Sequence, residues 1–164
     1  MAKLTDITDS EAQELALEFA ENIHAGFPSP AADHAGERID LAREMTPHPE
    51  TTFYYYIAPY SAVWWGERFI SGEFFKALEA ERIVIESILP YENVRLFSFN
   101  MNTDLTTDLN NYKDAMHYAE WVNSDINRWM SEGKYEITWD NYEDYLKAEQ
   151  DFYGTFPYNS LFLQ

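Results

Sequence analysis

Apolar residues recur every three or four positions near the start of the chain, which is the spacing of one face of an α-helix. The apolar face of this segment carries Leu15, Phe19 and Ile23. Thr8 and Glu11 have the spacing of an N-terminal capping box, and Gly26 is a typical C-terminal stop. The pattern therefore predicts a helix over residues 8–26, and a Ser-Pro pair opens a second predicted helix over about 29–45.

The rest of the chain alternates between extended and helical patterns. Runs rich in aromatic and β-branched residues predict strands at 51–58, 93–101 and 134–139. Helical spacing predicts helices at 61–70, 72–89, 107–132 and 140–154. Ser71 is the expected N-cap of the second of these helices, and Asp140 is that of the last, with Glu143 as its capping-box partner. The final apolar residues, 155–164, are expected to pack against the core.

Short strands separated by several helices predict an α+β fold, a helix-rich single domain over residues 1–164 with a small sheet of three or four short strands. Hydrophobic residues make up 46% of the chain and charged residues 24%, which is typical of a globular protein. No apolar run approaches the roughly 18 residues of a membrane span, so we expect no membrane contact. The first residues lack a signal-peptide pattern and cysteine is absent, so we expect the cytoplasm of a host or infected bacterial cell.

Charge is the most unusual property of the sequence. Acidic residues number 29 and basic residues 11, and the net charge of -18 is divided evenly between the two halves of the chain. Nucleic acids and anionic membranes are bound by clustered Lys and Arg, so direct contact with either is not expected. Along a diameter of roughly 40 Å the charge density is about 0.45 per Å, close to the roughly 0.6 per Å of B-DNA. A rigid fold with this density can take the place of duplex at a DNA-binding surface.

The first predicted helix carries four glutamates on one face, within about 80° of one another. These residues are Glu11, Glu14, Glu18 and Glu21. Basic partners at helical spacing are missing, and Glu14 and Glu18 repel one another. A solvated helix face is the alternative interpretation of this pattern. The last predicted helix adds Asp140, Glu143 and Asp144, and both sets are candidate phosphate surrogates that bind a partner protein.

Aromatic residues account for 17% of the chain, and two tryptophans, Trp64 and Trp65, are adjacent. Adjacent residues on a helix point about 100° apart, so one narrow apolar stripe does not accommodate both. We therefore expect at least one of the two to bind a partner, which includes a second copy in a homodimer. Core packing is the expected role of other aromatic residues in this region, namely Phe53, Tyr55, Phe74 and Phe75.

Two pairs place an acidic residue three positions before a histidine, a spacing found in metal-binding helices. The pairs are Glu21 with His24 and Asp114 with His117, and Glu120 follows the second pair. With 29 acidic residues such pairs arise by chance, so we predict no metal site and no cofactor. Paired carboxylates suited to acid–base chemistry arise by chance in the same way. The sequence contains no phosphate-binding loop and no nucleophile elbow, and we expect no enzymatic activity.

These properties favour an acidic DNA-mimic inhibitor that blocks the DNA-binding channel of a host defence nuclease by electrostatic competition. The chain resembles DNA mimics of phages and mobile elements in size, acidity, lack of cysteine and aromatic content. That resemblance implies a basic DNA-binding protein or nuclease complex as the partner, in an anti-restriction, anti-CRISPR or repair-inhibiting role. Two alternatives remain open. One is an acidic adaptor or assembly protein with an aromatic interface, and the other is a haloadapted protein of unrelated function.

Overall fold

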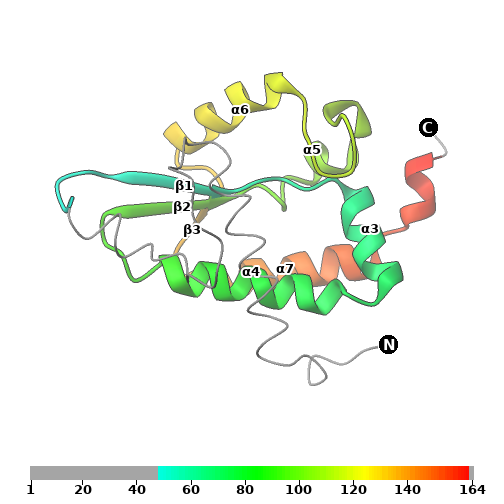
Figure 1. Ribbon diagram of the computed structural model, residues 1–164, viewed down its shortest axis with the longest axis horizontal. Coiled ribbons are helices and arrows are strands. Elements are labelled where there is room, and N and C mark those ends of the chain that lie inside the picture. The colour runs from blue at the N-terminus through cyan, green and yellow to red at the C-terminus, as the bar shows by residue number, and fades with distance from the viewer. Residues whose placement is uncertain (1–47, 163–164) are drawn as a thin grey trace, which may run out of the picture.

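The computed structural model describes residues 48–162, which form a small sheet between two helical layers (Figure 1). This arrangement confirms the predicted helix-rich α+β fold with a small sheet. The two helices predicted at 8–26 and 29–45 lie outside the described residues. The four glutamates predicted to form a partner-binding stripe lie outside them too, namely Glu11, Glu14, Glu18 and Glu21.

The sheet has three strands in the order β1-β2-β3 within the described residues. The first strand, β1 (Phe53–Ile57), pairs in parallel with β2 (Val94–Ser98), and Ile57 lies opposite Ser98. The third strand, β3 (Glu136–Ile137), pairs antiparallel with β2. All three strands fall inside the predicted segments. Because β1 and β2 are parallel and in register, both strands end at the same edge of the sheet.

Two helices connect β1 to β2. The first, α3 (Ala62–Ser71), begins after Ser61, whose hydroxyl oxygen accepts a hydrogen bond from a backbone N–H of the first turn. It ends at Gly72, which has a φ of 81°, a left-handed conformation that glycine adopts without strain. The second, α4 (Phe74–Ile88), follows directly. Both helices agree with the predicted ranges.

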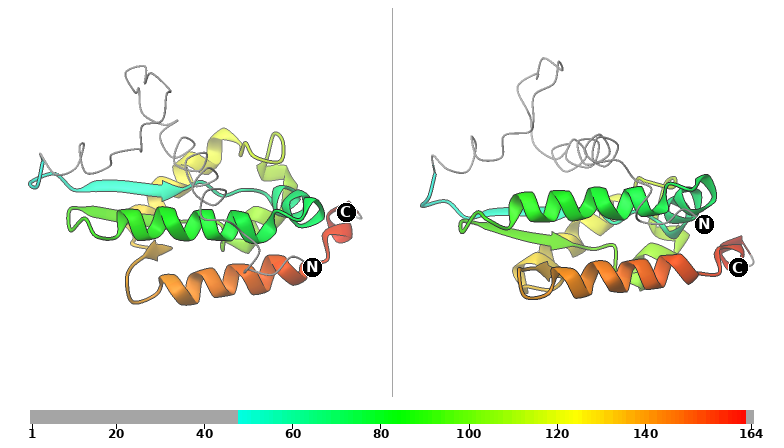
Figure 2. Two further views of the ribbon diagram at one scale, coloured as in Figure 1. Left: turned by 60° about the horizontal axis from the view of Figure 1, so that its bottom comes forward. Right: turned by 90° about the horizontal axis from the view of Figure 1, so that it is seen from below.

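Helices cover both faces of the sheet. Helix α4 lies side by side with α7 (Tyr142–Thr155) on one face, and α6 (Glu120–Ser131) covers the other (Figures 1 and 2). Neighbouring residues of a strand point to opposite faces, so Leu96 joins the core beneath α4 and α7, whereas Phe97 joins the core beneath α6. Within the described residues, no helix is long and apolar enough to cross a membrane.

The long helix predicted over residues 107–132 is wrong in its first half. The chain there forms α5 (Thr103–Thr107), a short 3-10 helix (Leu109–Asn111) and a loop, and α6 begins only at Glu120. The apolar spacing in this segment belongs to a loop that packs its apolar residues on the core, not to a continuous helix.

Two aspartates explain why the helix is interrupted. Asp108 Oδ1 accepts a hydrogen bond from the Asn110 backbone N–H at 3.0 Å. Asp114 Oδ1 accepts from the backbone N–H groups of Met116 and His117 at 2.9 and 2.8 Å. Side chains that bind nearby backbone N–H groups stabilise turns in place of helical hydrogen bonds. The pattern of apolar residues alone does not reveal this competition.

The two predicted N-caps on α4 and α7 are also wrong. Glu73 occupies the N-cap position of α4 without a side-chain cap, and the Ser71 hydroxyl donates to a carbonyl of the preceding helix. Helix α7 begins after Asn141, whose side-chain oxygen accepts from the Thr138 backbone N–H instead of capping the helix. Asp140 therefore caps nothing, because the helix starts one residue later than the sequence pattern suggests.

The residues that follow α7 turn back onto α3. A 3-10 helix (Tyr158–Phe162) lies there, and Leu161 is buried in the core, as predicted for this apolar segment. Gly66 on α3 lies directly beneath the Tyr158 ring, where a Cβ atom at position 66 would be only 2.8 Å from a ring carbon. The Tyr158 hydroxyl donates to the Tyr153 carbonyl at 2.6 Å. The absence of a side chain at Gly66 is thus what lets this segment close on the domain.

Candidate functional site

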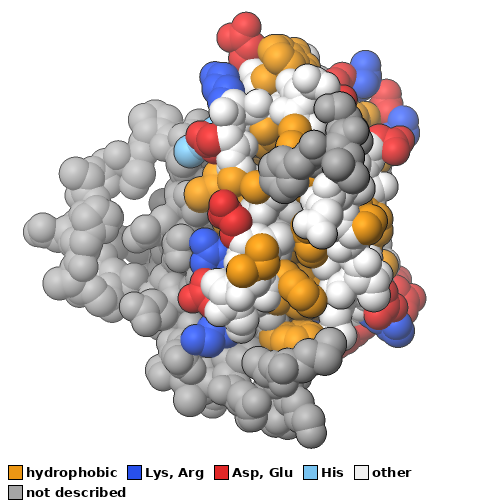
Figure 3. All heavy atoms as spheres, turned by 90° about the vertical axis from the view of Figure 1, so that its right-hand side faces the viewer, with side chains coloured by type: hydrophobic (Ala, Val, Ile, Leu, Met, Phe, Trp, Pro, Cys, Tyr) orange, Lys and Arg blue, Asp and Glu red, His pale blue; other side chains and the backbone are white. Residues whose placement is uncertain are grey.

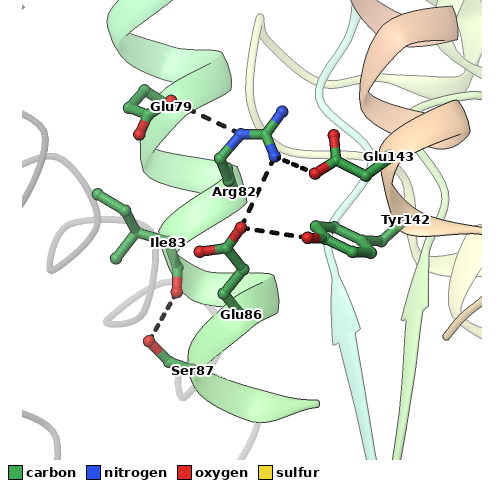
Figure 4. Close-up of polar contacts among 7 residues, drawn as sticks. All are labelled: Glu79, Arg82, Ile83, Glu86, Ser87, Tyr142 and Glu143. Atoms are coloured by element: carbon green, nitrogen blue, oxygen red, sulfur yellow. Dashed lines mark hydrogen bonds and ion pairs between the residues drawn. The ribbon is translucent and has the colours of Figure 1, made fainter. Parts of the chain in front are cut away.

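Asp140, Glu143 and Asp144, the predicted phosphate surrogates on the last helix, are exposed around the start of α7. Their charges are not equivalent. Arg82 on α4 donates to the Glu143 carboxylate at 2.9 Å, and this hydrogen bond lowers the pKa of Glu143 (Figure 4). The same guanidinium lies within 4 Å of Glu79 and Glu86. Glu143 is thus engaged in an ion pair with Arg82, whereas Asp140 and Asp144 have no such pair among the described residues.

Trp64 and Trp65, the predicted partner-binding tryptophans, are both buried, at 5% and 0% exposure. The expectation that one of them is exposed is wrong. Trp64 stacks on Tyr60 at 4.3 Å between ring centroids, and Trp65 stacks on Tyr153 at 4.7 Å. Helix α3 packs against other elements on more than one side, so two adjacent residues can both point into the core. A buried indole offers no contact surface to a partner.

Basic side chains in the described part of the chain are largely bound to carboxylates. Those in ion pairs are Arg68, Arg82, Arg95, Arg128, Lys134 and Lys147. Several exposed acids there have no basic group of the described residues within 4 Å, namely Glu67, Glu92, Asp104, Glu120, Asp140 and Asp144. The end of the molecule near α3 shows acids and bases side by side around hydrophobic side chains (Figure 3). The excess negative charge therefore resides on acids that lie outside these ion pairs, and on the face of Figure 3 it does not form a continuous acidic surface.

The loop before α6 brings Asp114 and His117 to the edge where β1 and β2 end. The Ser61 hydroxyl, just after β1, donates to the Ala115 carbonyl at 2.7 Å. The Tyr112 hydroxyl donates to the Pro59 carbonyl at 3.1 Å. Parallel strands of α/β proteins bind ligands at this carboxyl edge, so the loop lies where such folds place functional groups.

Asp114 and His117 form a hydrogen-bonded pair. His117 Nδ1 lies 2.9 and 2.8 Å from the two carboxylate oxygens of Asp114. Hydrogen bonds from the backbone N–H groups of His117 and Met116, together with the imidazole, lower the pKa of Asp114 to about 2. The carboxylate is therefore ionised at neutral pH, and an ionised carboxylate favours the tautomer with its proton on Nδ1. Nε2 is then the basic nitrogen, on a side chain that is 72% exposed.

The spacing of Asp114 and His117 in the sequence is that of metal-binding helices, but the structure places the two residues differently. Asp114 and His117 lie in a loop and not on a helix, and Glu120 begins α6. Among residues 48–162, no group of three or more His, Asp or Glu side chains is placed to hold a metal ion. In the arrangement of Asp114 and His117 the carboxylate orients the imidazole through Nδ1 and leaves Nε2 on an exposed side chain.

A second carboxyl cluster lies in the core between α4, α7 and the end of β2. Glu81 and Glu149 are completely buried. The Tyr145 hydroxyl lies 2.5 Å from Glu81 Oε1, 3.1 Å from Glu149 Oε1 and 2.7 Å from the Ser98 hydroxyl. Asn100 Nδ2 donates to Glu81 Oε2 at 3.1 Å. The sequence prediction does not include this cluster, because chance alone produces many carboxylate pairs in a chain with 29 acidic residues.

A signal for the cluster is nevertheless present in the sequence. The positions three and four residues on either side of Glu81 are occupied by Ala77, Leu78, Val84 and Ile85. These four residues form the buried face of α4, so Glu81 sits at the centre of an apolar stripe. Glu149 likewise shares a buried helical face with Leu146 and Tyr153. An acid inside an apolar stripe identifies a buried carboxyl group, even though the sequence does not say what it contacts.

Comparisons with known proteins give no assignment, since neither a known protein family nor a solved structure matches this chain.

Proposed function

We propose that Asp114 and His117 form an acid–base site that promotes hydrolysis of a substrate bound at the carboxyl edge of β1 and β2. The observation that carries the proposal is the fixed geometry of the pair, with one imidazole nitrogen bound to an ionised aspartate and the other exposed. The sequence favoured a protein without enzymatic activity, and that prediction stays untested. The geometry of the loop supports acid–base catalysis more directly than it supports any other activity.

Each member of the pair has a distinct role in this proposal. Asp114 orients the imidazole and stabilises the imidazolium that forms when His117 takes up a proton. His117 Nε2 accepts that proton from water or from a hydroxyl group as it attacks a carbonyl carbon, and then returns it to the leaving group. The hydrogen bonds of Ser61 and Tyr112 hold the loop, so the imidazole keeps one position relative to the sheet edge.

The test is hydrolysis of an activated ester such as p-nitrophenyl acetate, because an imidazole nitrogen reacts with this substrate, as a base or as a nucleophile, without a specific binding pocket. His117→Ala is expected to remove most of the activity, since general-base catalysis contributes about 100-fold or more. His48→Ala is the matched control, because His48 is also exposed beside a carboxylate, Glu50 at 3.7 Å. Equal rates for the two variants, with folding confirmed by circular dichroism, would overturn the proposal.

A second candidate function is the DNA-mimic inhibitor favoured by the sequence. The observation that supports it is the engagement of basic side chains in ion pairs, which leaves exposed acids such as Asp140 and Asp144 without a basic partner among the described residues. A partner with a basic DNA-binding channel would be attracted to these acids by long-range electrostatics. The buried positions of Trp64 and Trp65 remove these two residues from the aromatic interface of the adaptor alternative, whereas Trp121 and Trp139 are exposed and keep that alternative open.

The mimic proposal is tested by capturing partners from a bacterial lysate with the tagged protein, with and without excess duplex DNA. A nuclease or other DNA-binding protein whose recovery is lost on adding DNA or salt supports the proposal. Asp140→Asn and Asp144→Asn, each as a single substitution, should weaken that recovery more than Glu143→Gln, because Glu143 is already ion-paired with Arg82. Recovery that is indifferent to DNA, salt and all three substitutions contradicts it.

A further inference from the structure

Among residues 48–162, no basic side chain pairs with the buried glutamates Glu81 and Glu149. The groups that face it from α4, α7 and the end of β2 are Ser98, Asn100, Tyr145 and, more distantly, Tyr153, and none of these carries a positive charge. Two ionised carboxylates in this position would repel one another in a medium of low dielectric constant. At least one proton must therefore be retained between them.

The hydrogen-bond donors of the cluster point to where that proton resides. Glu81 is within hydrogen-bond distance of three donors, with Tyr145 and Ser98 at one oxygen and Asn100 at the other. Tyr145 has a single hydroxyl proton, and its shortest contact is the one to Glu81. If Tyr145 donates its proton to Glu81, the contact between Tyr145 and Glu149 is a hydrogen bond only when Glu149 is protonated and donates to the Tyr145 oxygen.

The second oxygen of Glu149 supports the same assignment. Oε2 is fully buried and forms no hydrogen bond within the described residues. Leaving a charged carboxylate oxygen without a donor is far more unfavourable than leaving the carbonyl oxygen of a neutral acid without one. Glu149 is therefore the better site for the proton, and Glu81 is the better site for the charge.

We propose that Glu149 is a neutral carboxylic acid at neutral pH and donates its proton to the contact with Tyr145 and Glu81. This hydrogen bond stabilises the packing of α7 against α4 and β2. The proposal is independent of either proposed function. Burial raises the pKa of Glu149 well above its ordinary value, and the nearby Glu81 raises it further. Burial also raises the pKa of Glu81, to about 7, against the effect of its hydrogen-bond donors.

The predicted consequence is that the free energy of unfolding of the domain falls as pH rises. A carboxyl group whose pKa is raised on folding stabilises the fold fully below the unfolded pKa and loses that contribution as pH rises. From about pH 5 upward, the unfolding equilibrium constant should rise about tenfold per pH unit for each proton held by the folded state. Surface acids with lowered pKa values, such as Glu136 and Asp114, affect stability only at lower pH.

The test is urea unfolding between pH 5 and pH 9 for the wild-type protein, Glu149→Gln and the control Glu143→Gln on the same helix. A glutamine amide can donate to Tyr145 as the neutral acid does, so Glu149→Gln should fold. The unfolding equilibrium constant of this variant should depend less steeply on pH than that of the wild-type protein. The difference should be about a factor of ten per pH unit, because the folded variant holds one proton fewer. Glu143→Gln should leave the slope above pH 5 unchanged. A wild-type slope in Glu149→Gln would overturn the proposal.

A second measurement needs no variant. Infrared spectroscopy of the folded wild-type protein at pH 7 should show the C=O stretch of a protonated carboxylic acid, which weakens as pH rises. Absence of that band at pH 7 would overturn the proposal. So would a rise in melting temperature on adding Mg²⁺ or Ca²⁺ together with loss of the band, because a cation and not a proton would then hold the pair.

Discussion

Asp114 and Glu149 are both carboxyl groups that contact a second titratable side chain, yet their pKa values shift in opposite directions. Asp114 is exposed and accepts two backbone N–H hydrogen bonds, which stabilise its charged form. Glu149 is buried with one unpartnered oxygen, which destabilises its charged form. The number of donors and the access of water, more than the neighbouring residue, decide which protonation state each carboxyl group holds.

The comparison also separates two uses of an acid in one small domain. At the edge of the sheet, the charge of Asp114 is retained to orient His117. In the core, Glu149 keeps a proton and serves as a hydrogen-bond donor between helices. The two sites respond to opposite ends of the pH range.

Tyr145→Phe should have the largest effect on the buried side of the comparison. The change removes the hydroxyl that contacts both glutamates and leaves them without their shared partner. We expect a loss of about 3 kcal/mol in the free energy of unfolding, at the upper end for hydrogen bonds to charged groups. Urea unfolding at pH 7 measures it. Tyr142→Phe is the control, since its hydroxyl contacts surface carboxylates, Glu86 at 3.4 Å and Glu143, and a similar loss there would contradict the interpretation.

Glu81→Gln should rank second, and its comparison with Glu149→Gln shows which glutamate carries the charge. The amide at position 81 would place an N–H group against one of the donors that now face Glu81, so a loss of about 2 kcal/mol is expected at pH 8. Glu149→Gln should lose less, because an amide reproduces a neutral donor. Unfolding by urea at pH 8 gives both values, and the reverse order would assign the proton to Glu81.

Asp114→Asn should alter the exposed pair without unfolding the domain. An amide side chain no longer favours the Nδ1-protonated imidazole, so His117 should shift toward the Nε2-protonated form. Nitrogen-15 chemical shifts of the imidazole at high pH report this change directly. Asp108→Asn is the matched control, because Asp108 forms a similar turn with Asn110 but does not contact His117. An unchanged tautomer in Asp114→Asn would show that the aspartate does not orient the ring.

Surface charges should give the smallest effects. Exposed ion pairs contribute little to stability, so Glu143→Gln is expected to leave the melting temperature nearly unchanged. Glu92→Gln removes an exposed acid that lies outside the described helices and has no ion pair among the described residues, so it should raise the melting temperature slightly at low salt and not at high salt. Calorimetry at two salt concentrations tests both, and a large loss in either variant would mean that these charges have a structural role.

Much of the fold is predictable from the sequence because its signals are local. The aromatic run at β1, the apolar spacing of α4 and the alternation at β3 each determine the type of one element. Pairing within the sheet was not predicted, because the parallel contact between β1 and β2 joins residues about 40 positions apart. The interrupted helix before α6 was missed because Asp108 and Asp114 compete for backbone N–H groups.

The candidate sites were harder to predict than the fold. The sequence shows the spacing of Asp114 and His117. The contact between the two side chains and their position at the sheet edge depend on a turn that the spacing does not predict. The sequence around Glu81 and Glu149 places each acid within an apolar stripe, which indicates a buried carboxyl group. A total count of acidic residues does not show this pattern. Trp64 and Trp65 were misassigned because one helix was treated as having a single buried side.

One amide side chain joins these two regions. Asn100 donates to Glu81 in the core, and its Oδ1 accepts a hydrogen bond from the Tyr60 backbone N–H at 3.1 Å, next to the residue that holds the Asp114 loop. Polarisation passes along such a chain of hydrogen bonds. The amide resonance of Tyr60 should therefore be a built-in reporter of the core titration. It offers a spectroscopic view of a buried proton through the side chain of Asn100.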